Sequence, residues 1–236
     1  MVEKFFLALD YPDRDTVVRV GLQAVEFLDR EFGSAVNGKL GVKLNQDLFT
    51  GSMDTYHPFD NRDVFADMKI SHGAGTGKKI IDNIKPLANV RYVTVAAGLC
   101  PEILREYVSH AHKHGIDVVA FTAHTNIPED QARRVYHGET MSDVIFNLGE
   151  VAYDGGCDAI VLEGAALEDP RIRNLRLKKV VTGVRIDPND KGQQRRVTAL
   201  DSLSEVKQMA NYVVVSSRYL GQEKRPALAK YFAALL

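Results

Sequence analysis

An acid and a base stand two residues apart at the end of an apolar run, in Val64-Phe65-Ala66-Asp67-Met68-Lys69-Ile70. Residues i and i+2 of a strand point to the same face, so the side chains of Asp67 and Lys69 should project together. A carboxylate beside an ammonium group can take part in proton transfer, or it can be a structural ion pair at a strand end. The positions of the other charged residues separate these two interpretations.

Two other short apolar runs also carry charges near their ends. Asp10 follows the run 5–9, and Lys43 lies within the run 40–44. Together with Asp67 and Lys69 they place four charges on three consecutive expected strands. Buried charges cost several kcal/mol unless they are paired, so an alternating network of aspartate and lysine is physically reasonable. A shared site for these four side chains requires that the three strands lie parallel and end at the same edge.

Eight short apolar runs, rich in branched residues, alternate along the chain with stretches of helical periodicity. The expected strands are 5–10, 40–44, 63–69, 91–95, 117–122, 158–162, 179–182 and 212–215. Strands that are apolar on both faces and separated by helices are typical of a parallel sheet covered by helices. Eight such units in 236 residues predict an α/β fold, a (β/α)8 TIM barrel forming a single domain over residues 1–236, rather than a doubly wound open sheet.

The composition excludes several classes of protein. A hydrophobic fraction of 45% and a charged fraction of 26% are ordinary for a soluble globular domain. The net charge of -1 gives no electrostatic case for nucleic acid or an anionic membrane as a partner. No run approaches the roughly 20 apolar residues of a membrane helix, and no signal peptide is evident, so we expect a cytoplasmic protein. Cys100 and Cys157 are expected to be buried, reduced thiols.

The segment Gly73-Ala74-Gly75-Thr76-Gly77-Lys78 has the composition of a phosphate-binding loop. A Walker A motif requires glycine at the position of His72 and serine or threonine at the position of Lys79. The dinucleotide fingerprint fails as well, because it requires glycine at Lys78. We therefore expect flexible backbone before a helix, with only a weak capacity to bind anions.

The run His110-Ala111-His112-Lys113-His114 contains three histidines. On a helix His110 and His114 share one face while His112 points away, so this run alone should not supply three metal ligands. A solvated helix end, with cations near its negative pole, accounts for the pattern. No Cys/His spacing resembles a zinc site, and no Gly-x-Ser-x-Gly elbow supports an acyl-transfer enzyme. The sequence thus predicts no metal site.

Two polar stretches follow the last two expected strands. The first ends in Gln193-Gln194-Arg195-Arg196, and the second is Ser216-Ser217-Arg218. Barrels often bind a phosphate between the loops after strands 7 and 8, and the planar guanidinium of arginine suits phosphate. Solvated surface arginines are the alternative interpretation.

Taken together, these motifs resemble the orotidine 5'-phosphate decarboxylase family over nearly the whole chain. Leu7-Ala8-Leu9-Asp10 resembles the family's opening strand, Lys43 its strand-2 lysine, and Asp67-Met68-Lys69-Ile70-Ser71-His72 its Asp-x-Lys-x-x-Asp signature. The stretches 181–185 and 193–198 are similar to the family's phosphate-binding stretch, and 213–218 to the strand before its phosphate-binding arginine. His72 stands where the family has an acid that enters the site from the partner subunit.

The resemblance implies that the protein removes CO2 from C6 of orotidine 5'-phosphate to give uridine 5'-phosphate in pyrimidine biosynthesis, without cofactor or metal. Lys69 would be the proton donor, Asp67 would face the substrate carboxylate, and Lys43 would hold Asp67 and a ribose hydroxyl. His72 completes the implied catalytic set. The implied substrate-binding residues are Asp10, Thr76, Thr125, Gln194 and Arg218. The resemblance also implies a homodimer whose active site lies at the subunit interface.

Related sugar-phosphate enzymes that enolise ketose phosphates through magnesium carry an acid on strand 2. Lys43 therefore favours the metal-free decarboxylase branch. Two alternatives remain open: a divergent enzyme on the same barrel that acts on another nucleotide or sugar phosphate, and a nucleotide-binding protein that has lost its chemistry.

Overall fold

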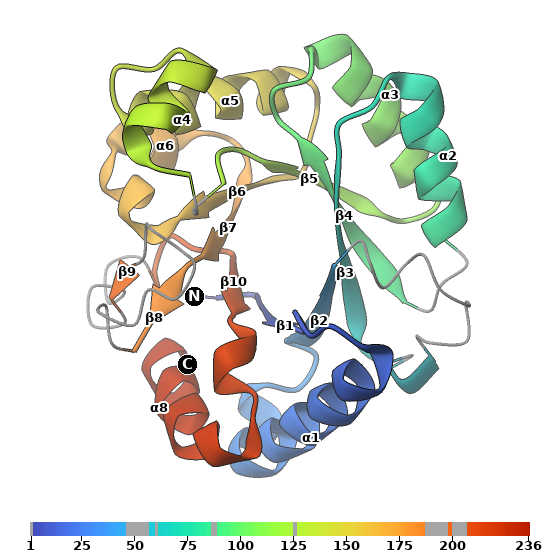
Figure 1. The fold of residues 1–236 in the computed structure, drawn as a ribbon, viewed down its shortest axis with the longest axis vertical. Helices are drawn as coiled ribbons and strands as arrows, with labels where there is room; N and C mark the ends of the chain where they lie inside the picture. Colours follow the sequence, from blue (N-terminus) through green and yellow to red (C-terminus); the bar gives the residue numbers. More distant parts are fainter. Residues whose placement is uncertain are drawn as a thin grey trace.

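The computed structural model describes residues 2–45, 57–59, 61–85, 89–124, 127–186, 198–199 and 207–236. Parallel strands close into a barrel in the order β1-β10-β7-β6-β5-β4-β3-β2, with helices around its outside (Figure 1). The strands are β1 (Lys4–Ala8), β2 (Leu40–Asn45), β3 (Asp63–Ile70), β4 (Val90–Ala96), β5 (Asp117–Phe121), β6 (Ala159–Glu163), β7 (Lys178–Thr182) and β10 (Tyr212–Val215). The predicted (β/α)8 barrel is confirmed.

The helices that cover the barrel are α1 (Arg14–Phe32), α2 (Ala74–Ile84), α3 (Pro101–His112), α4 (Glu129–Tyr136), α5 (Met141–Asp154), α6 (Pro170–Asn174) and α8 (Arg225–Leu235). Local signals set several of their starts. The Asp13 carboxylate accepts the Thr16 backbone N–H at 2.8 Å ahead of α1, and Thr140 and Asp143 form a capping box at α5. A small parallel pair, β8 (Val184–Arg185) and β9 (Thr198–Ala199), lies beside the barrel.

The inside of the barrel is filled by aromatic side chains. Phe6 contacts Phe65 and Tyr92 edge to face, with both ring centroids 5.1 Å away, and Tyr212 packs 5.5 Å from Tyr92. Gly41 makes room for them, because a Cβ there would lie 2.8 Å from the Phe6 ring. This layer closes the barrel below its carboxyl end, so polar side chains nearer the strand ends face a mouth and not a pore.

Strand β3 departs from regular geometry at the residues that the sequence singled out. Ala66 pairs with Val93 of β4 and Ile70 with Val95, so Asp67, Met68 and Lys69 lie opposite Thr94 alone. Lys69 takes up the extra length with a positive φ of 47°. A bulge of this kind re-aims side chains, and here it turns both charged groups toward the mouth.

Two expectations are corrected. The glycine-rich segment is not a flexible loop, because α2 begins at Ala74 and includes Gly77. A Cβ on Gly77 would lie 2.1 Å from the Tyr107 ring of α3, so the glycine permits close packing of the two helices.

Cys157 is buried as expected, but Cys100 is exposed, because it is the residue before α3 where the chain leaves the barrel. Within the described ranges, none of the helices combines the length and apolarity that crossing a bilayer demands.

Candidate active site

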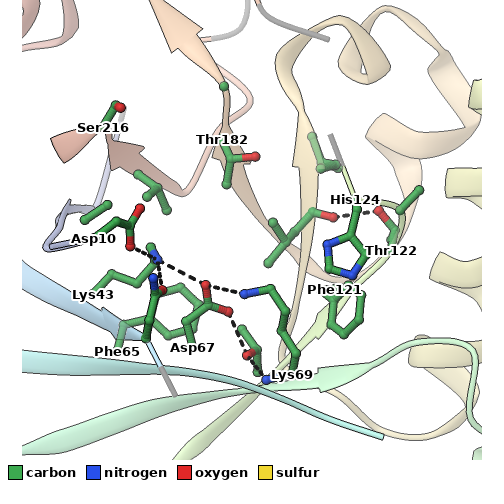
Figure 2. Close-up of a pocket in the computed structure, with 18 of the residues that line it drawn as sticks. Asp10, Lys43, Phe65, Asp67, Lys69, Phe121, Thr122, His124, Thr182 and Ser216 are labelled. Atoms are coloured by element: carbon green, nitrogen blue, oxygen red, sulfur yellow. Dashed lines mark hydrogen bonds and ion pairs between the residues drawn. The ribbon is translucent and has the colours of Figure 1, made fainter. Parts of the chain in front are cut away.

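A cavity of about 260 Å³ opens at the carboxyl ends of the barrel strands. Its walls come from both halves of the chain, including Asp10, Lys43, Asp67 and Lys69 on one side and Thr182 and Ser216 on another. The four charged residues therefore share one mouth, as their places in the sequence predicted. Figure 2 shows them as a row, with His124 near the Lys69 end of that row.

The four charges alternate along that row. Lys43 Nζ donates to Asp10 Oδ1 at 3.0 Å, to Asn45 Oδ1 at 2.8 Å and to Asp67 Oδ2 at 3.1 Å. Lys69 Nζ lies 2.6 Å from the same Asp67 oxygen. Asp67 therefore bridges two ammonium groups, of which the Lys43 side chain is 10% exposed and the Lys69 side chain 37% exposed. Lys69 is the one that can meet a ligand in the cavity.

Burial and charge act in opposite directions on this network. Burial alone would raise the pKa of Asp67, but the ammonium groups of Lys43 and Lys69 outweigh it and hold that pKa far below its ordinary value. Burial would lower the pKa of Lys43, yet the carboxylates of Asp67 and Asp10 raise it. Asp67 and Lys43 therefore stay charged at neutral pH, and the site offers a fixed pattern of charge.

Thr94 and Asn45 belong to the site, although the sequence analysis did not select them. The Thr94 hydroxyl donates to Asp67 Oδ1 at 2.9 Å and accepts the backbone N–H of Lys69 at 2.7 Å. One hydroxyl thus fixes both the carboxylate and the bulge. A polar residue within or directly after an apolar run was a usable signal, since Asn45 follows the run 40–44 and Thr94 lies inside the fourth run.

His124 also lines the cavity, near the Lys69 end of the row, and the sequence analysis missed it as well. Its ring lies over Phe121, with the centroids 4.9 Å apart, just beyond the end of β5. Burial, followed by the charge of Lys69, lowers the pKa of His124 despite the opposing effect of Asp67. The imidazole therefore favours its neutral form in a cavity that already holds two ammonium groups.

The family model described as "Orotidine 5'-phosphate decarboxylase / HUMPS family" matches residues 3–230. The chain belongs to this family. No curated protein sequence matches it.

Solved structures share the barrel of this decarboxylase/HUMPS family member. A crystal structure of orotidine 5'-monophosphate decarboxylase from Methanocaldococcus jannaschii, complexed with the inhibitor BMP, superposes with a TM-score of 0.70 at 19% identity, covering 100% of this chain and 99% of that one. Orotidine 5'-phosphate decarboxylase from Pyrococcus horikoshii OT3 gives 0.66 at 15% identity, covering 98% of each chain. An uncharacterized conserved protein from Geobacillus kaustophilus gives 0.69 at 14%, covering 98% and 100%. At these identities the likeness concerns the fold.

Not every residue suggested by the resemblance to the decarboxylases lines the cavity of the single chain. His72 and Thr76 are exposed to solvent, in the loop after β3 and in the first turns of α2. The His72 backbone carbonyl accepts the Tyr107 hydroxyl at 2.5 Å, which ties this loop to α3. Arg218 is half-buried in a short 3-10 helix after β10. Thr125 and Gln194 lie outside the described residues.

Proposed function

We propose that this protein is a decarboxylase of pyrimidine nucleotide monophosphates, converting orotidine 5'-phosphate to uridine 5'-phosphate. The observation that carries the proposal is the row Asp10–Lys43–Asp67–Lys69, in which Lys69 is the ammonium group most exposed to the cavity. Membership in the decarboxylase/HUMPS family supports the same reaction class.

The reaction requires an ammonium group beside the reacting carbon. When the bond between C6 and the carboxylate breaks, CO2 leaves and its electron pair remains on C6 as a vinyl carbanion. Lys69 stabilises this charge by proximity and then donates a proton to C6. Its partner Asp67 stays ionised through its contacts with both lysines, so it holds the Lys69 ammonium in position.

Asp67 also has an effect on the bound substrate. Its carboxylate would lie near the substrate carboxylate, and the repulsion between them is relieved as CO2 departs. Lys43 and Thr94 hold Asp67 from two sides, at 3.1 Å and 2.9 Å, so the carboxylate cannot turn away. The site is thereby organised for the transition state before substrate binds.

The arrangement around Lys43 favours a reaction without a metal ion. Its ammonium nitrogen sits among oxygens of Asp10, Asn45 and Asp67 at 2.8 to 3.1 Å. A magnesium ion would need such a cluster of oxygens, and the lysine takes that central place with a fixed positive charge.

The far end of the cavity suits the phosphate group. Gly183, Arg185 and Ser216 line it from the segments that follow β7 and β10, where barrels commonly bind phosphate. Phe121, Val161 and Val214 give the same cavity apolar surface, which suits a planar base.

The test follows the fall in ultraviolet absorbance of orotidine 5'-phosphate. Wild-type protein is expected to turn it over, and Lys69→Ala and Lys69→Gly are expected to abolish turnover while still binding uridine 5'-phosphate. Lys69→Gly is the matched variant for folding, because glycine accepts the positive φ at this position. Near-normal turnover by either variant would refute the role assigned to Lys69.

A second candidate function rests on the exposure of His72. The fourth member of the implied catalytic set does not reach the cavity of its own subunit, and it is not an acid. A divergent enzyme acting on another nucleotide or sugar phosphate, or a nucleotide-binding protein without chemistry, would retain the same cavity. Tight binding of uridine 5'-phosphate together with no loss of orotidine 5'-phosphate would favour these alternatives.

A further inference from the structure

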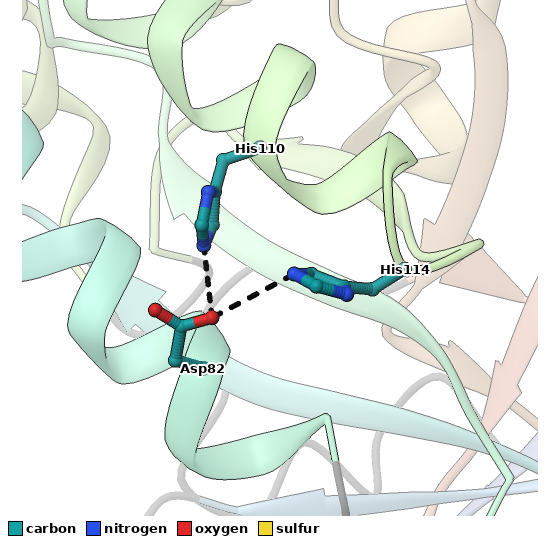
Figure 3. A group of neighbouring side chains, drawn as sticks. All are labelled: Asp82, His110 and His114. Carbon is teal, nitrogen blue, oxygen red and sulfur yellow. Dashed lines mark hydrogen bonds and ion pairs between the residues drawn. The ribbon is translucent and has the colours of Figure 1, made fainter.

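Three side chains converge on one point between α2 and α3, away from the cavity. His110 Nε2 lies 3.1 Å from Asp82 Oδ1, and His114 Nε2 lies 3.6 Å from the same oxygen. Figure 3 shows both rings directed at this carboxylate. The candidate ligand atoms all lie within 4.8 Å of one another. Two imidazoles and a carboxylate therefore meet at one place.

The helical path explains why the two histidines face the same way. His110 is in α3, and Lys113, which caps the helix, keeps helical backbone angles, so the spacing of four residues brings His114 onto the same face. Their rings lie 5.3 Å apart, edge to face. Asp82 comes from the last turn of α2. The sequence could not reveal this third member, because it lies 28 residues before His110.

These donors match the preferences of a divalent transition-metal ion. Zinc takes imidazole nitrogen and carboxylate oxygen at about 2.0–2.1 Å, and two ligands of a tetrahedral ion at that distance are about 3.3 Å apart. The observed separations of 3.1 and 3.6 Å lie on either side of that value. The three side chains are 20%, 42% and 27% exposed, for His110, Asp82 and His114, so solvent can reach the site and supply the remaining ligand.

We propose that Asp82, His110 and His114 form a binding site for a divalent transition-metal ion of the zinc class. The ion would be held by the two Nε2 atoms and the Asp82 carboxylate, with water completing the tetrahedron. In the structure the Asp82 carboxylate is joined to His110 by a hydrogen bond of 3.1 Å and to Lys85 by an ion pair of 3.2 Å. Lys85 is 40% exposed, so its ammonium group can move into solvent when an ion binds.

A second group of possible ligands, His112, Asp117 and Asp158, is a weaker candidate and a useful comparison. It offers one imidazole only. The Asp158 Oδ2 atom nearest His112 already accepts the backbone N–H of Val118 at 2.7 Å, which fixes the carboxylate for a structural purpose. Since imidazole nitrogen is the donor that distinguishes zinc from magnesium or calcium, the group with two histidines is favoured.

A bound ion would join α2 to α3 at the ends remote from the mouth. Both helices run back from the carboxyl ends of their strands, so their last turns lie at the amino-terminal end of the barrel. These helices follow β3 and β4, the strands that carry Lys69 and Thr94. The ion would therefore stabilise the part of the barrel that supports the charged row, without touching substrate.

Equilibrium dialysis of the untagged full-length protein against zinc chloride tests the proposal. One tight site per chain is expected. His110→Gln and His114→Gln should each lower the zinc affinity by at least about tenfold. Mutation of a residue that only hydrogen-bonds to a metal ligand already costs about that much, and these histidines are the ligands themselves. His112→Gln, a change in the same helix, should leave the affinity unchanged. Absence of a tight site, or a loss confined to His112→Gln, would overturn the assignment.

Thermal unfolding provides a readout that does not depend on activity. A ligand that binds only the folded state raises the melting temperature, so zinc should raise the Tm of the wild type and of His112→Gln. His110→Gln should lose this rise, and His110→Cys should keep it, because thiolate is also a zinc ligand. An equal rise in wild type and His110→Gln would contradict the proposal.

Discussion

At the scale of single residues, Lys69 combines an unusual backbone with the proposed chemical role. Its φ of 47° lies in the left-handed region, which costs a residue with a side chain roughly 1–2 kcal/mol. The hydrogen bond from its backbone N–H to Thr94 Oγ1 offsets part of this cost. The conformation places the Lys69 ammonium group 2.6 Å from Asp67. Strain of this kind at a ligand-facing position is typical of functional sites.

His72 should limit the rate of the proposed reaction. The resemblance to the decarboxylases implies that position 72 enters the cavity of the partner subunit, where an aspartate would add a negative charge to a network with two lysines. Histidine is instead neutral or cationic near neutral pH. We expect slow turnover of orotidine 5'-phosphate by the native protein and a higher kcat/KM in His72→Asp, measured between about pH 5 and 9. If His72→Asp instead lowers activity by orders of magnitude, His72 is itself a working catalytic residue.

His124 should make the folded state sensitive to mild acid. Its pKa is lowered in the folded protein from 6.5, first by burial and then by Lys69, so the unfolded chain binds its proton at higher pH than the folded chain does. Stability is then fully present above that ordinary value and falls as the pH drops below it. The free energy of unfolding in urea should fall between about pH 7 and about pH 5, and it should fall less in His124→Asn than in wild type.

The matched control for that experiment is His137→Asn. His137 is exposed and has a positive φ of 55°, a conformation that asparagine also tolerates. In this variant the free energy of unfolding should fall with pH by as much as it does in wild type. If the free energy of unfolding falls equally in His124→Asn and in wild type, the assigned burial of His124 is wrong.

At the scale of elements, α2 and α3 position the loop that carries His72. Gly77 allows the Tyr107 ring to lie directly against α2, and the Tyr107 hydroxyl reaches the His72 carbonyl at 2.5 Å. Gly77 thus serves helix packing and the placement of a loop at the barrel mouth.

Gly77→Ala should destabilise the protein. The added Cβ would lie 2.1 Å from the Tyr107 ring, and overpacking of this kind costs about 1–3 kcal/mol. Gly75→Ala is the matched control in the same helix, because a Cβ there meets nothing within 4 Å. It should be neutral or stabilise by up to about 1 kcal/mol through helix propensity. If the two substitutions change the free energy of unfolding in urea equally, the contact between Gly77 and Tyr107 does not contribute to stability.

At the scale of the whole molecule, the barrel presents His72 and Thr76 on its surface beside the mouth. Neither side chain lines the cavity of its own chain, and the resemblance to the decarboxylases implies that this loop enters the site of a partner subunit. A second copy of the chain over the mouth would bring both residues to a cavity and cover it from solvent.

We therefore expect a homodimer in solution. Sedimentation at micromolar concentration should give about twice the chain mass of 26.2 kDa. Thr76→Arg, at the expected interface, should shift the protein toward monomer. Tyr153→Arg should leave the mass unchanged, because Tyr153 is 43% exposed at the end of α5 that lies away from the mouth. A monomer at all concentrations tested would rule out the shared site.

The sequence by itself determined the barrel and the charged row. Each strand is apolar on both faces, which specifies a parallel sheet under helices, and the end of each strand fixes which residues meet at the mouth. Asp10, Lys43, Asp67 and Lys69 could be selected for that reason, since strand periodicity is a local property.

Only the tertiary structure decided which residues meet from distant parts of the chain. Thr94 joins the site because β4 pairs with a bulge in β3, and His124 joins it because β5 pairs with β4. Asp82 joins His110 because α2 packs on α3. The same holds for the glycine-rich segment, whose composition favours a loop but which forms the start of α2, with Gly77 packed against Tyr107. Such choices depend on the free energy of packing between elements, which no local pattern contains.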